Sequence, residues 1–340
     1  MKAAMFYKSG EPLKIEEVQE PELEIGEVLV KVSACGVCHT DLHYMDHGVP
    51  TFKSPPLILG HEPSGVVEEV GEGVEAISKG DRVLIPPVFT CGWCFFCRTG
   101  RENICANMLM LGNHMDGAYA EYVKAPAKDV FILPSQIPLE EGSIIADAVS
   151  TPYHAVKNRA GVQPGDVVAV FGCGGVGINV IQISAASGAH VIAVDISDKK
   201  LEWAREFGAS EVVNPEEVEK VSKEIKKLTG GGADIAIEAI GNPGTIEDAF
   251  NSLRSGGRLC VIGYTPESFK LSGAKLMFRE MEVIGSLGCR PVDYPPLLKM
   301  AAEGKIKIKP QVTHRFSLQE INAAFDTLRS GDCLRCIVVM

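Results

Sequence analysis

Residues that can bind a metal ion crowd into the stretch from Cys38 to Glu62, which opens with Cys-His-Thr-Asp-Leu-His and closes with Gly-His-Glu. The cysteine thiolate and the neutral imidazole of histidine are ligands that zinc prefers. Four of the chain's eight histidines fall within these 25 residues: His39, His43, His47 and His61. The stretch therefore predicts a zinc site, and the alternative is a loop whose histidines are solvated.

A second group of potential ligands consists of cysteines spaced C-x2-C-x2-C-x7-C. Four thiolates this close together can surround one ion, as in a closed, tetrahedral structural zinc site. The short spacing would strain a disulfide between any two of these cysteines. The alternative to a zinc site is four unrelated buried thiols. The predicted ligands of this zinc ion are Cys91, Cys94, Cys97 and Cys105. Except for Cys38, the remaining cysteines are expected to be small buried residues: Cys35, Cys173, Cys260, Cys289, Cys333 and Cys336.

A glycine-rich turn marks a nucleotide site. Val167–Phe171 has the pattern of an apolar strand, and it runs into Gly-Cys-Gly-Gly-Val-Gly at the start of a helix predicted over 176–187. In this context the turn is a dinucleotide-binding fingerprint, in which the helix N-terminus faces the pyrophosphate. The predicted cofactor-binding residues of the turn are Gly172, Gly174, Gly175, Val176 and Gly177.

The residue that ends the next predicted strand indicates which dinucleotide binds. Asp195 follows Gly177 by 18 residues. Its carboxylate can accept hydrogen bonds from free ribose hydroxyls and would repel a 2′-phosphate, so NAD is favoured over NADP. The alternative is a solvated aspartate at the end of a strand.

Length and pattern predict two domains of the α/β class. A chain of 340 residues exceeds what one hydrophobic core usually serves. The first third is rich in short strands, whereas from Val167 onward strands and helices alternate. Six strands with interleaved helices, one of them over 215–229, predict a doubly wound parallel sheet. After Gly288 a tail with helices at 296–303 and 318–329 is expected to pack on the first domain.

Composition excludes several classes of partner. The net charge of −11 and pI near 5.3 leave no basic surface for nucleic acid or an anionic membrane. No apolar run approaches the 18 or so residues that span a bilayer. The first residues, Met1–Lys8, have the pattern of a short strand rather than of a secretion signal, so we expect a cytoplasmic protein.

Taken together, these motifs resemble the zinc-containing medium-chain alcohol dehydrogenases over essentially the whole chain. The resemblance implies a GroES-like, β-rich catalytic domain at 1–149 and 287–340 and an NAD-binding Rossmann domain at 150–286, with the active site in the cleft between them. It also implies a small alcohol or ketone as substrate, two zinc ions per chain, and a homodimer or homotetramer.

The resemblance assigns roles residue by residue. Cys38 and His61 correspond to ligands of the catalytic zinc, and Glu62 to the carboxylate behind the metal, which can exchange with water on it. Thr40 corresponds to the hydroxyl that bonds the substrate alcohol, and His43 to the group that passes its proton to solvent. Further correspondences are His39 and Arg335 with pyrophosphate contacts, Thr151 with a nicotinamide contact, Lys200 with a ribose contact, and Asp41 with a partner of His61.

One position departs from the family pattern. The family supplies its third zinc ligand as cysteine in a Cys-x-x-x-Thr segment, whereas this sequence has Asp147 four residues before Thr151. A carboxylate is an acceptable zinc ligand, and carboxylates replace this cysteine in some polyol and sugar dehydrogenases. The alternatives are that Asp147 only holds a water molecule or that the catalytic site is often empty. The segment around Asp147 also resembles the subgroup of 6-hydroxycyclohex-1-ene-1-carbonyl-CoA dehydrogenase.

The predicted function is reversible hydride transfer between an alcohol, secondary or cyclic, and NAD. A hydroxyacyl-CoA thioester of the subgroup just named is the alternative substrate. Two other functions compete with this one. A metal-free quinone reductase would lack both the cysteine group and the Cys38/His61 pair. A non-catalytic NAD-binding protein would have no need of the proton path through Thr40 and His43. Beyond that path, His47, His114 and His154 are interpreted as loop or core residues.

Overall fold

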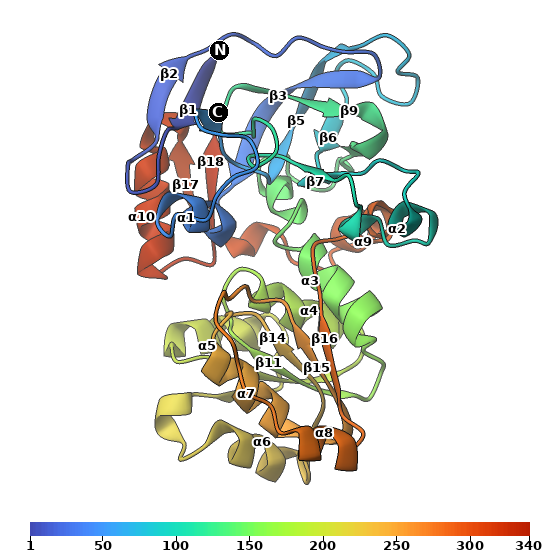
Figure 1. Ribbon diagram of the computed structural model, residues 1–340, viewed down its shortest axis with the longest axis vertical. Coiled ribbons are helices and arrows are strands. Elements are labelled where there is room, and N and C mark those ends of the chain that lie inside the picture. The colour runs from blue at the N-terminus through green and yellow to red at the C-terminus, as the bar shows by residue number, and fades with distance from the viewer. The chain divides into compact units, whose positions relative to one another are not determined.

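The computed structural model describes residues 1–340, which form two compact units. The first unit comprises Met1–Ser150 and Cys289–Met340, and the second comprises Thr151–Gly288 (Figure 1). No helix in the structure combines the length and the apolar character needed to span a membrane.

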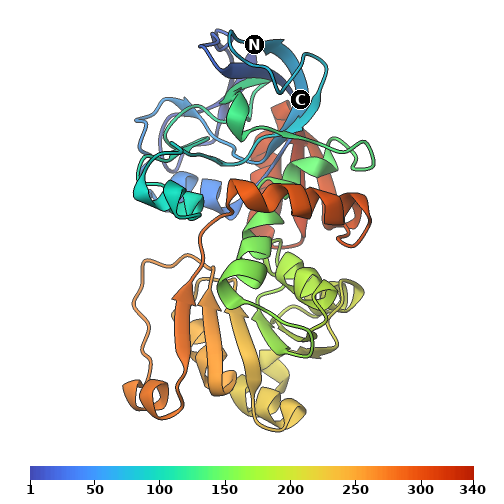
Figure 2. The same cartoon turned by 90° about the vertical axis from the view of Figure 1, so that its right-hand side faces the viewer.

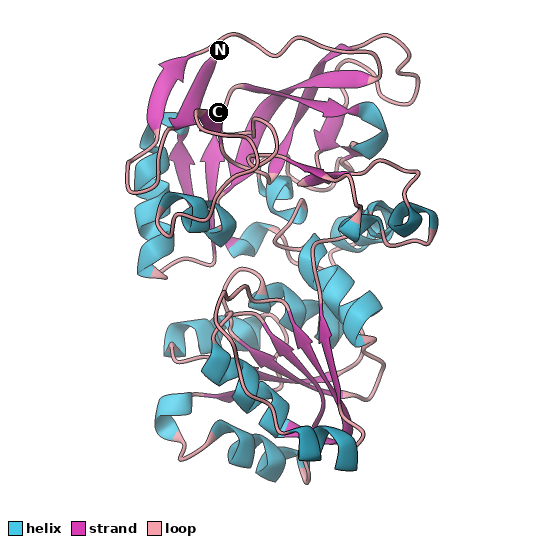
Figure 3. Cartoon of the chain, viewed as in Figure 1, coloured by secondary structure: helices cyan, strands magenta, loops and turns pink.

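The first unit is built on strands, as the alternating runs of the first third predict (Figure 3). Its largest sheet has the order β10-β6-β5-β3-β18-β17, with β9 also pairing with β3. A second sheet has the order β2-β1-β4, and β7 pairs with β8. The strands are β1 (Lys2–Phe6), β2 (Lys14–Glu17), β3 (Glu27–Gly36), β4 (Leu57–Ile58), β5 (Pro63–Val70), β6 (Arg82–Leu84), β7 (Val88–Phe89), β8 (Leu109–Met110), β9 (Tyr122–Pro126), β10 (Phe131–Ile132), β17 (Val312–Ser317) and β18 (Arg335–Val339).

The C-terminal tail completes the sheet of the first unit. Strand β18 pairs antiparallel with β3, with Ile337 opposite Gly36, and parallel with β17 on its other side. Apolar side chains from β3 and β18 share one core with α10, in which the Phe325 ring meets the Tyr119 ring edge to face at 5.8 Å. The helices of this unit are α1 (His39–Met45), α2 (Phe95–Arg98), α9 (Tyr294–Ala302) and α10 (Ile321–Ser330), and α3 (Ser150–His154) begins at its boundary.

The second unit is a six-stranded parallel sheet in the order β13-β12-β11-β14-β15-β16, which confirms the predicted doubly wound fold. Helices cover both of its faces (Figure 2). Strand β11 lies inside the sheet, so its apolar run is buried. The elements are β11 (Val167–Phe171), α4 (Gly177–Ala186), β12 (His190–Val194), α5 (Asp198–Glu206), β13 (Glu211–Val213), α6 (Val221–Thr229), β14 (Ala233–Glu238), α7 (Pro243–Ser252), β15 (Leu253–Val261), α8 (Gly273–Phe278) and β16 (Glu282–Gly285).

The helix predicted over 215–229 was wrong at its start. Pro215–Glu217 forms only a 3-10 turn, and the side chain of the preceding residue, the N-cap Asn214, accepts a hydrogen bond from Glu216 N. The backbone is extended at Val218 and Lys220 before α6 begins. The charge pattern of the segment continues through this break, so it cannot reveal where the backbone leaves the helix.

Candidate active site

The predicted ligand Cys38 lies where the chain passes from strand β3 into helix α1. It is the N-cap of α1, and its Sγ accepts a hydrogen bond from Thr40 N at 3.5 Å. The Thr40 hydroxyl lies 3.6 Å from the same sulfur. The strand-to-helix turn thus brings a buried thiol and a hydroxyl to one point.

His61 reaches this point from the segment after β4. The residue before it, Gly60, has φ +95° and packs closely on the Tyr119 ring. A Cβ at this position would lie 2.9 Å from that ring, so the backbone that carries His61 requires glycine here. Asp41 Oδ1 lies 3.4 Å from His61 Nδ1, and Asp41 Oδ2 accepts a hydrogen bond from the Tyr119 hydroxyl at 2.7 Å. Tyr119 and Asp41 therefore orient the imidazole, with Nε2 turned toward Asp147 Oδ2 at 3.6 Å.

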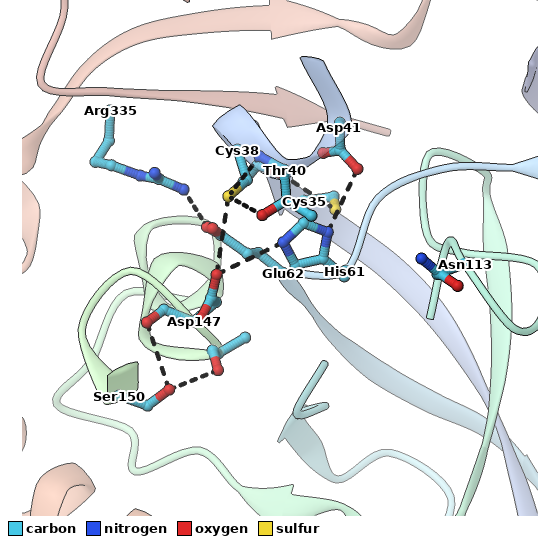
Figure 4. Close-up of polar contacts among 12 residues, drawn as sticks. Cys35, Cys38, Thr40, Asp41, His61, Glu62, Asn113, Asp147, Ser150 and Arg335 are labelled. Atoms are coloured by element: carbon cyan, nitrogen blue, oxygen red, sulfur yellow. Dashed lines mark hydrogen bonds and ion pairs between the residues drawn. The ribbon is translucent and has the colours of Figure 1, made fainter. Parts of the chain in front are cut away.

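The ligand atoms of Cys38, His61, Glu62 and Asp147 all lie within 4.8 Å of one another. Figure 4 shows the side chains of Cys38, His61 and Asp147 converging. His61 Nε2 and Glu62 Oε1 are buried without a hydrogen-bond partner, which is costly unless another group binds them. Thiolate, imidazole and carboxylate are the donors of catalytic zinc sites. The residues therefore fit zinc.

The electrostatics of this group also fit a dication. Burial lowers the pKa of His61, but the charges of Asp41 and Cys38 outweigh it and raise that pKa well above its usual value. Burial raises the pKa of Cys38 as well, and Asp147 adds to the effect. The negative charges that favour a proton on the buried His61 would equally favour a metal cation bound in place of that proton.

Behind the group, Glu62 forms an ion pair with Arg335 of strand β18. Both side chains are buried, Glu62 at 0% and Arg335 at 3% exposure. Burial raises the pKa of Glu62 despite the guanidinium, whose charge lowers it. The structure thus places Arg335 against Glu62 inside the first unit, and its predicted contact with pyrophosphate stays a prediction.

The turn that carries Asp147 is held by two hydroxyls. Ser150 Oγ donates to the carbonyl of Ala146 at 2.8 Å, and the Tyr294 hydroxyl donates to the same carbonyl at 2.7 Å. The two hydroxyls lie 3.2 Å apart, and Tyr294 is 1% exposed. Sequence reasoning could not find this role of Tyr294, since the contact joins residues 148 positions apart.

The four clustered cysteines form a separate group around the short helix α2. Their successive sulfur–sulfur distances are 3.4 Å (Cys91 to Cys105), 3.8 Å (Cys105 to Cys94) and 3.5 Å (Cys94 to Cys97). A tetrahedron of zinc–sulfur bonds of about 2.3 Å has sulfurs about 3.8 Å apart, so the group fits one zinc ion. Burial opposes ionisation of Cys91, but hydrogen bonds from the backbone of Trp93 and from Asn107 lower its pKa to about 6.

In the second unit, the glycine-rich turn has the geometry that the fingerprint requires. Gly172 has φ +95°, and a Cβ at Gly177 would lie 1.7 Å from the Gly172 carbonyl oxygen. A Cβ at Gly174 would meet nothing within 4 Å, so the backbone there is open to a ligand. Asp195 lies beside the turn, where its carboxylate accepts hydrogen bonds from Cys173 N at 2.8 Å and Ser197 N at 3.0 Å.

The remaining predicted residues lie on helices of the two units. His39 and His43 lie on α1, and His43 Nδ1 is 3.1 Å from His47 Nδ1. In the second unit, Thr151 is buried in α3, and Lys200 lies in the first turn of α5, where its N–H bonds the Ser197 hydroxyl. Their contacts with a cofactor stay predictions.

Comparison with known proteins decides the family. Residues 24–135 match the family model of the alcohol dehydrogenase GroES-like domain, and residues 175–303 match that of the zinc-binding dehydrogenases. The chain belongs to the zinc-containing medium-chain alcohol dehydrogenases. The first unit is therefore the GroES-like part of this family's fold and the second its Rossmann part.

Individual members of the family match nearly the full length. An alcohol dehydrogenase from Geobacillus stearothermophilus is 39% identical over 332 residues, which cover 97% of each chain. The crystal structure of the alcohol dehydrogenase from Aeropyrum pernix matches with a TM-score of 0.91 and 35% identity, covering 100% of both chains. The 2R,3R-butanediol dehydrogenase from Bacillus subtilis matches with a TM-score of 0.91 and 31% identity, covering 100% of this chain and 99% of its own.

Proposed function

We propose that this medium-chain dehydrogenase transfers a hydride reversibly between an alcohol and NAD at a zinc ion held by Cys38, His61 and Asp147. The observation that carries the proposal is the buried convergence of these donors with Glu62. Such a donor set, with one position open to substrate, is the arrangement of a catalytic zinc site. We propose further that residues 1–149 and 287–340 carry this site and that 150–286 bind NAD.

Zinc, when bound, acts as a Lewis acid that makes the substrate alcohol easier to deprotonate, and NAD accepts the hydride. The chain's own residues orient the ligands and move the proton. Asp41 holds the His61 ring, and Tyr119 in turn fixes Asp41. Arg335 neutralises Glu62, which leaves Cys38 and Asp147 as the anionic ligands.

The proton leaves through Thr40 and His43 in this proposal. The Thr40 hydroxyl lies beside the Cys38 sulfur, so it would lie next to an alcohol bound there and would take up the alcohol proton while it passes its own proton on toward His43. Burial lowers the pKa of His43, and the neighbouring His47 lowers it further. His43 is therefore neutral near pH 7 and able to take up the proton.

Asp195 supports NAD rather than NADP. Two backbone N–H groups fix its carboxylate beside the glycine-rich turn, and a fixed negative charge there repels a 2′-phosphate. We expect His39 and Arg335 at the pyrophosphate, Thr151 at the nicotinamide and Lys200 at the ribose. The test is the ratio of kcat/KM with NAD to that with NADP, which should exceed unity and fall in Asp195→Ser. A higher value with NADP would contradict the assignment.

The substrate is proposed to be a secondary or cyclic alcohol. The relative named 2R,3R-butanediol dehydrogenase supports this, because both hydroxyls of that diol are secondary. The alternative is a hydroxyacyl-CoA thioester. A panel of primary, secondary and cyclic alcohols assayed against such thioesters, with NAD as acceptor, separates these classes. If no member of the panel reduces NAD, the enzymatic proposal fails and a non-catalytic NAD-binding protein takes its place.

Two zinc ions per chain are proposed, one in each ligand group. Elemental analysis should give about two zinc per chain, and about one after either Asp147→Ala or Cys97→Ser, because the two residues belong to different groups. One zinc in the parent that neither Cys38→Ala nor Asp147→Ala removes would show that the catalytic group does not retain metal.

We also propose a cytoplasmic homodimer or homotetramer. Strand β16 is an edge of the parallel sheet, and an unpaired edge invites pairing with another chain. Large apolar side chains are exposed beside it on α8, with Met277 at 64% and Phe278 at 80% exposure. Light scattering of the purified protein gives the oligomeric state, and a monomer at micromolar concentration would contradict the proposal.

A further inference from the structure

Helix α1 and the residues after it carry three histidines at intervals of four. On a helix, residues four apart share one face, so His39 and His43 project from the same side of α1. His47 continues the series just beyond the C-cap residue Asp46. The proposed function uses His39 and His43, and it gives His47 no role.

The last two histidines of the series approach each other as closely as two ligands of one metal ion. His43 Nδ1 and His47 Nδ1 are 3.1 Å apart, with ring centroids at 5.3 Å. Two zinc–nitrogen bonds of about 2.05 Å that enclose an angle of about 100° place their nitrogens about 3.1 Å apart. A metal ion can therefore be bound by turning the rings, without moving the backbone.

Two contacts hold the chain segment that carries the pair. Val49 N donates to the His43 carbonyl at 3.1 Å, which closes the chain around His47. Asp46 accepts two hydrogen bonds of 2.8 Å from Arg329 of α10. Because the Asp46 carboxylate neutralises the Arg329 guanidinium, this arginine does not repel a cation bound at the histidines.

The pair is also accessible. His47 is exposed and His43 is half-buried, so an ion bound between them keeps positions for water. Imidazole suits Zn²⁺, Cu²⁺ and Ni²⁺. The same distance also fits a hydrogen bond between two neutral rings, in which one Nδ1–H donates to the other Nδ1. The geometry therefore predicts two states that compete: a hydrogen-bonded pair and a metal-bound pair.

We infer that His43 and His47 form a third metal site, which takes a d-block dication such as Zn²⁺ and inhibits the enzyme when filled. The inhibitory part rests on the proposed function, in which His43 accepts the alcohol proton. A metal ion on Nδ1 prevents that nitrogen from giving or taking a proton, so turnover slows while cofactor and catalytic ligands are unchanged.

The test measures zinc binding first and activity second. The full chain, loaded with its two zinc ions, is dialysed against rising free Zn²⁺ and its metal content is measured. Wild type should rise from about two zinc to about three per chain, and His47→Gln should stay at about two. His190→Gln, which alters an exposed histidine at the start of β12 in the second unit, is the matched control and should bind the third ion.

Activity at the same free Zn²⁺ tests the inhibition. At a concentration that reduces the wild-type rate about tenfold, His47→Gln should lose less than about twofold, and His190→Gln should behave as wild type. A third zinc that persists in His47→Gln, or that never binds to wild type, overturns the site. A third zinc that binds at this site without slowing turnover overturns the inhibition and counts against His43 as the proton acceptor, while leaving the catalytic zinc assignment untouched.

Discussion

The buried ion pair between Glu62 and Arg335 makes the stability of the first unit sensitive to a single substitution. We predict that Arg335→Met lowers the free energy of unfolding by about 3–5 kcal/mol, the usual cost of removing one partner of a buried pair. The structure favours the upper part of this range. Glu62 is 0% exposed, and its Oε1 has no hydrogen-bond partner. Without Arg335, and with zinc removed by a chelator, neither solvent nor a second protein donor to Oε1 compensates the charge.

The double variant separates the charge effect from loss of packing. Glu62→Gln together with Arg335→Met leaves two uncharged side chains of similar volume, and replacing a buried pair in this way is often nearly neutral. We therefore expect the double variant to unfold within about 2 kcal/mol of wild type, closer to it than Arg335→Met alone. The two substitutions should thus be strongly non-additive.

Hydrogen exchange is the suitable assay, because a chain of two units need not unfold in one step. Amide protection in β3 and β18 reports the opening free energy of the first unit alone. Arg329→Met is the control: its side chain is 37% exposed, so its loss should cost no more than about 1 kcal/mol. A cost below about 1 kcal/mol for Arg335→Met, or simple additivity in the double variant, would refute the reasoning.

Three further predictions concern other parts of the first unit. Cys97→Ser should reduce the zinc content by about one ion and lower the midpoint of thermal unfolding, since the group of four cysteines loses one of its thiolates. Arg329 lowers the pKa of Asp46 by hydrogen bonding, so the stability that Asp46 adds is present above pH 4 or so, its unfolded pKa, and is lost as the pH falls through the lower folded pKa. Hydrogen exchange of the β3 and β18 amides should show Asp46→Asn less stable than wild type by about 0.5–1 kcal/mol at pH 6, with the difference vanishing in acid. Tyr294→Phe should cost about 1 kcal/mol and speed zinc loss to a chelator from the Asp147 site, as measured by metal release, whereas a release rate equal to wild type would mean that Ser150 alone holds the turn.

The fold was predictable because its signals are local. A strand, a glycine-rich turn and a helix follow one another within some twenty residues from Val167, and the alternation of strand and helix continues through the six parallel strands. Metal ligands that lie close together in the sequence were equally predictable, as in the group of Cys91, Cys94, Cys97 and Cys105. Even so, the local charge pattern failed at 215–220, where charged residues continue although α6 begins only at Val221.

The parts of the site that could not be predicted depend on contacts between distant residues. Glu62 and Arg335 are 273 positions apart, and Tyr294 reaches Ala146 across 148 positions. No spacing rule links such residues, because sheet pairing of β18 with β3 is what brings the first two together. The His43–His47 contact is the converse case: the spacing is visible in the sequence, but the sequence alone does not show that the two nitrogens face each other.

The pairing of β18 with β3 has a consequence for how the protein is made. The ribosome releases β3 long before β18, and every residue of the second unit is synthesised between them. The second unit can therefore fold while the sheet of the first is still missing a central strand. Until Arg335 emerges, the carboxylate of Glu62 has no counter-ion. A nascent chain that stalls shortly before its last strand should thus carry a folded nucleotide-binding unit and an unfinished zinc centre, which makes late truncation products natural targets for proteolysis.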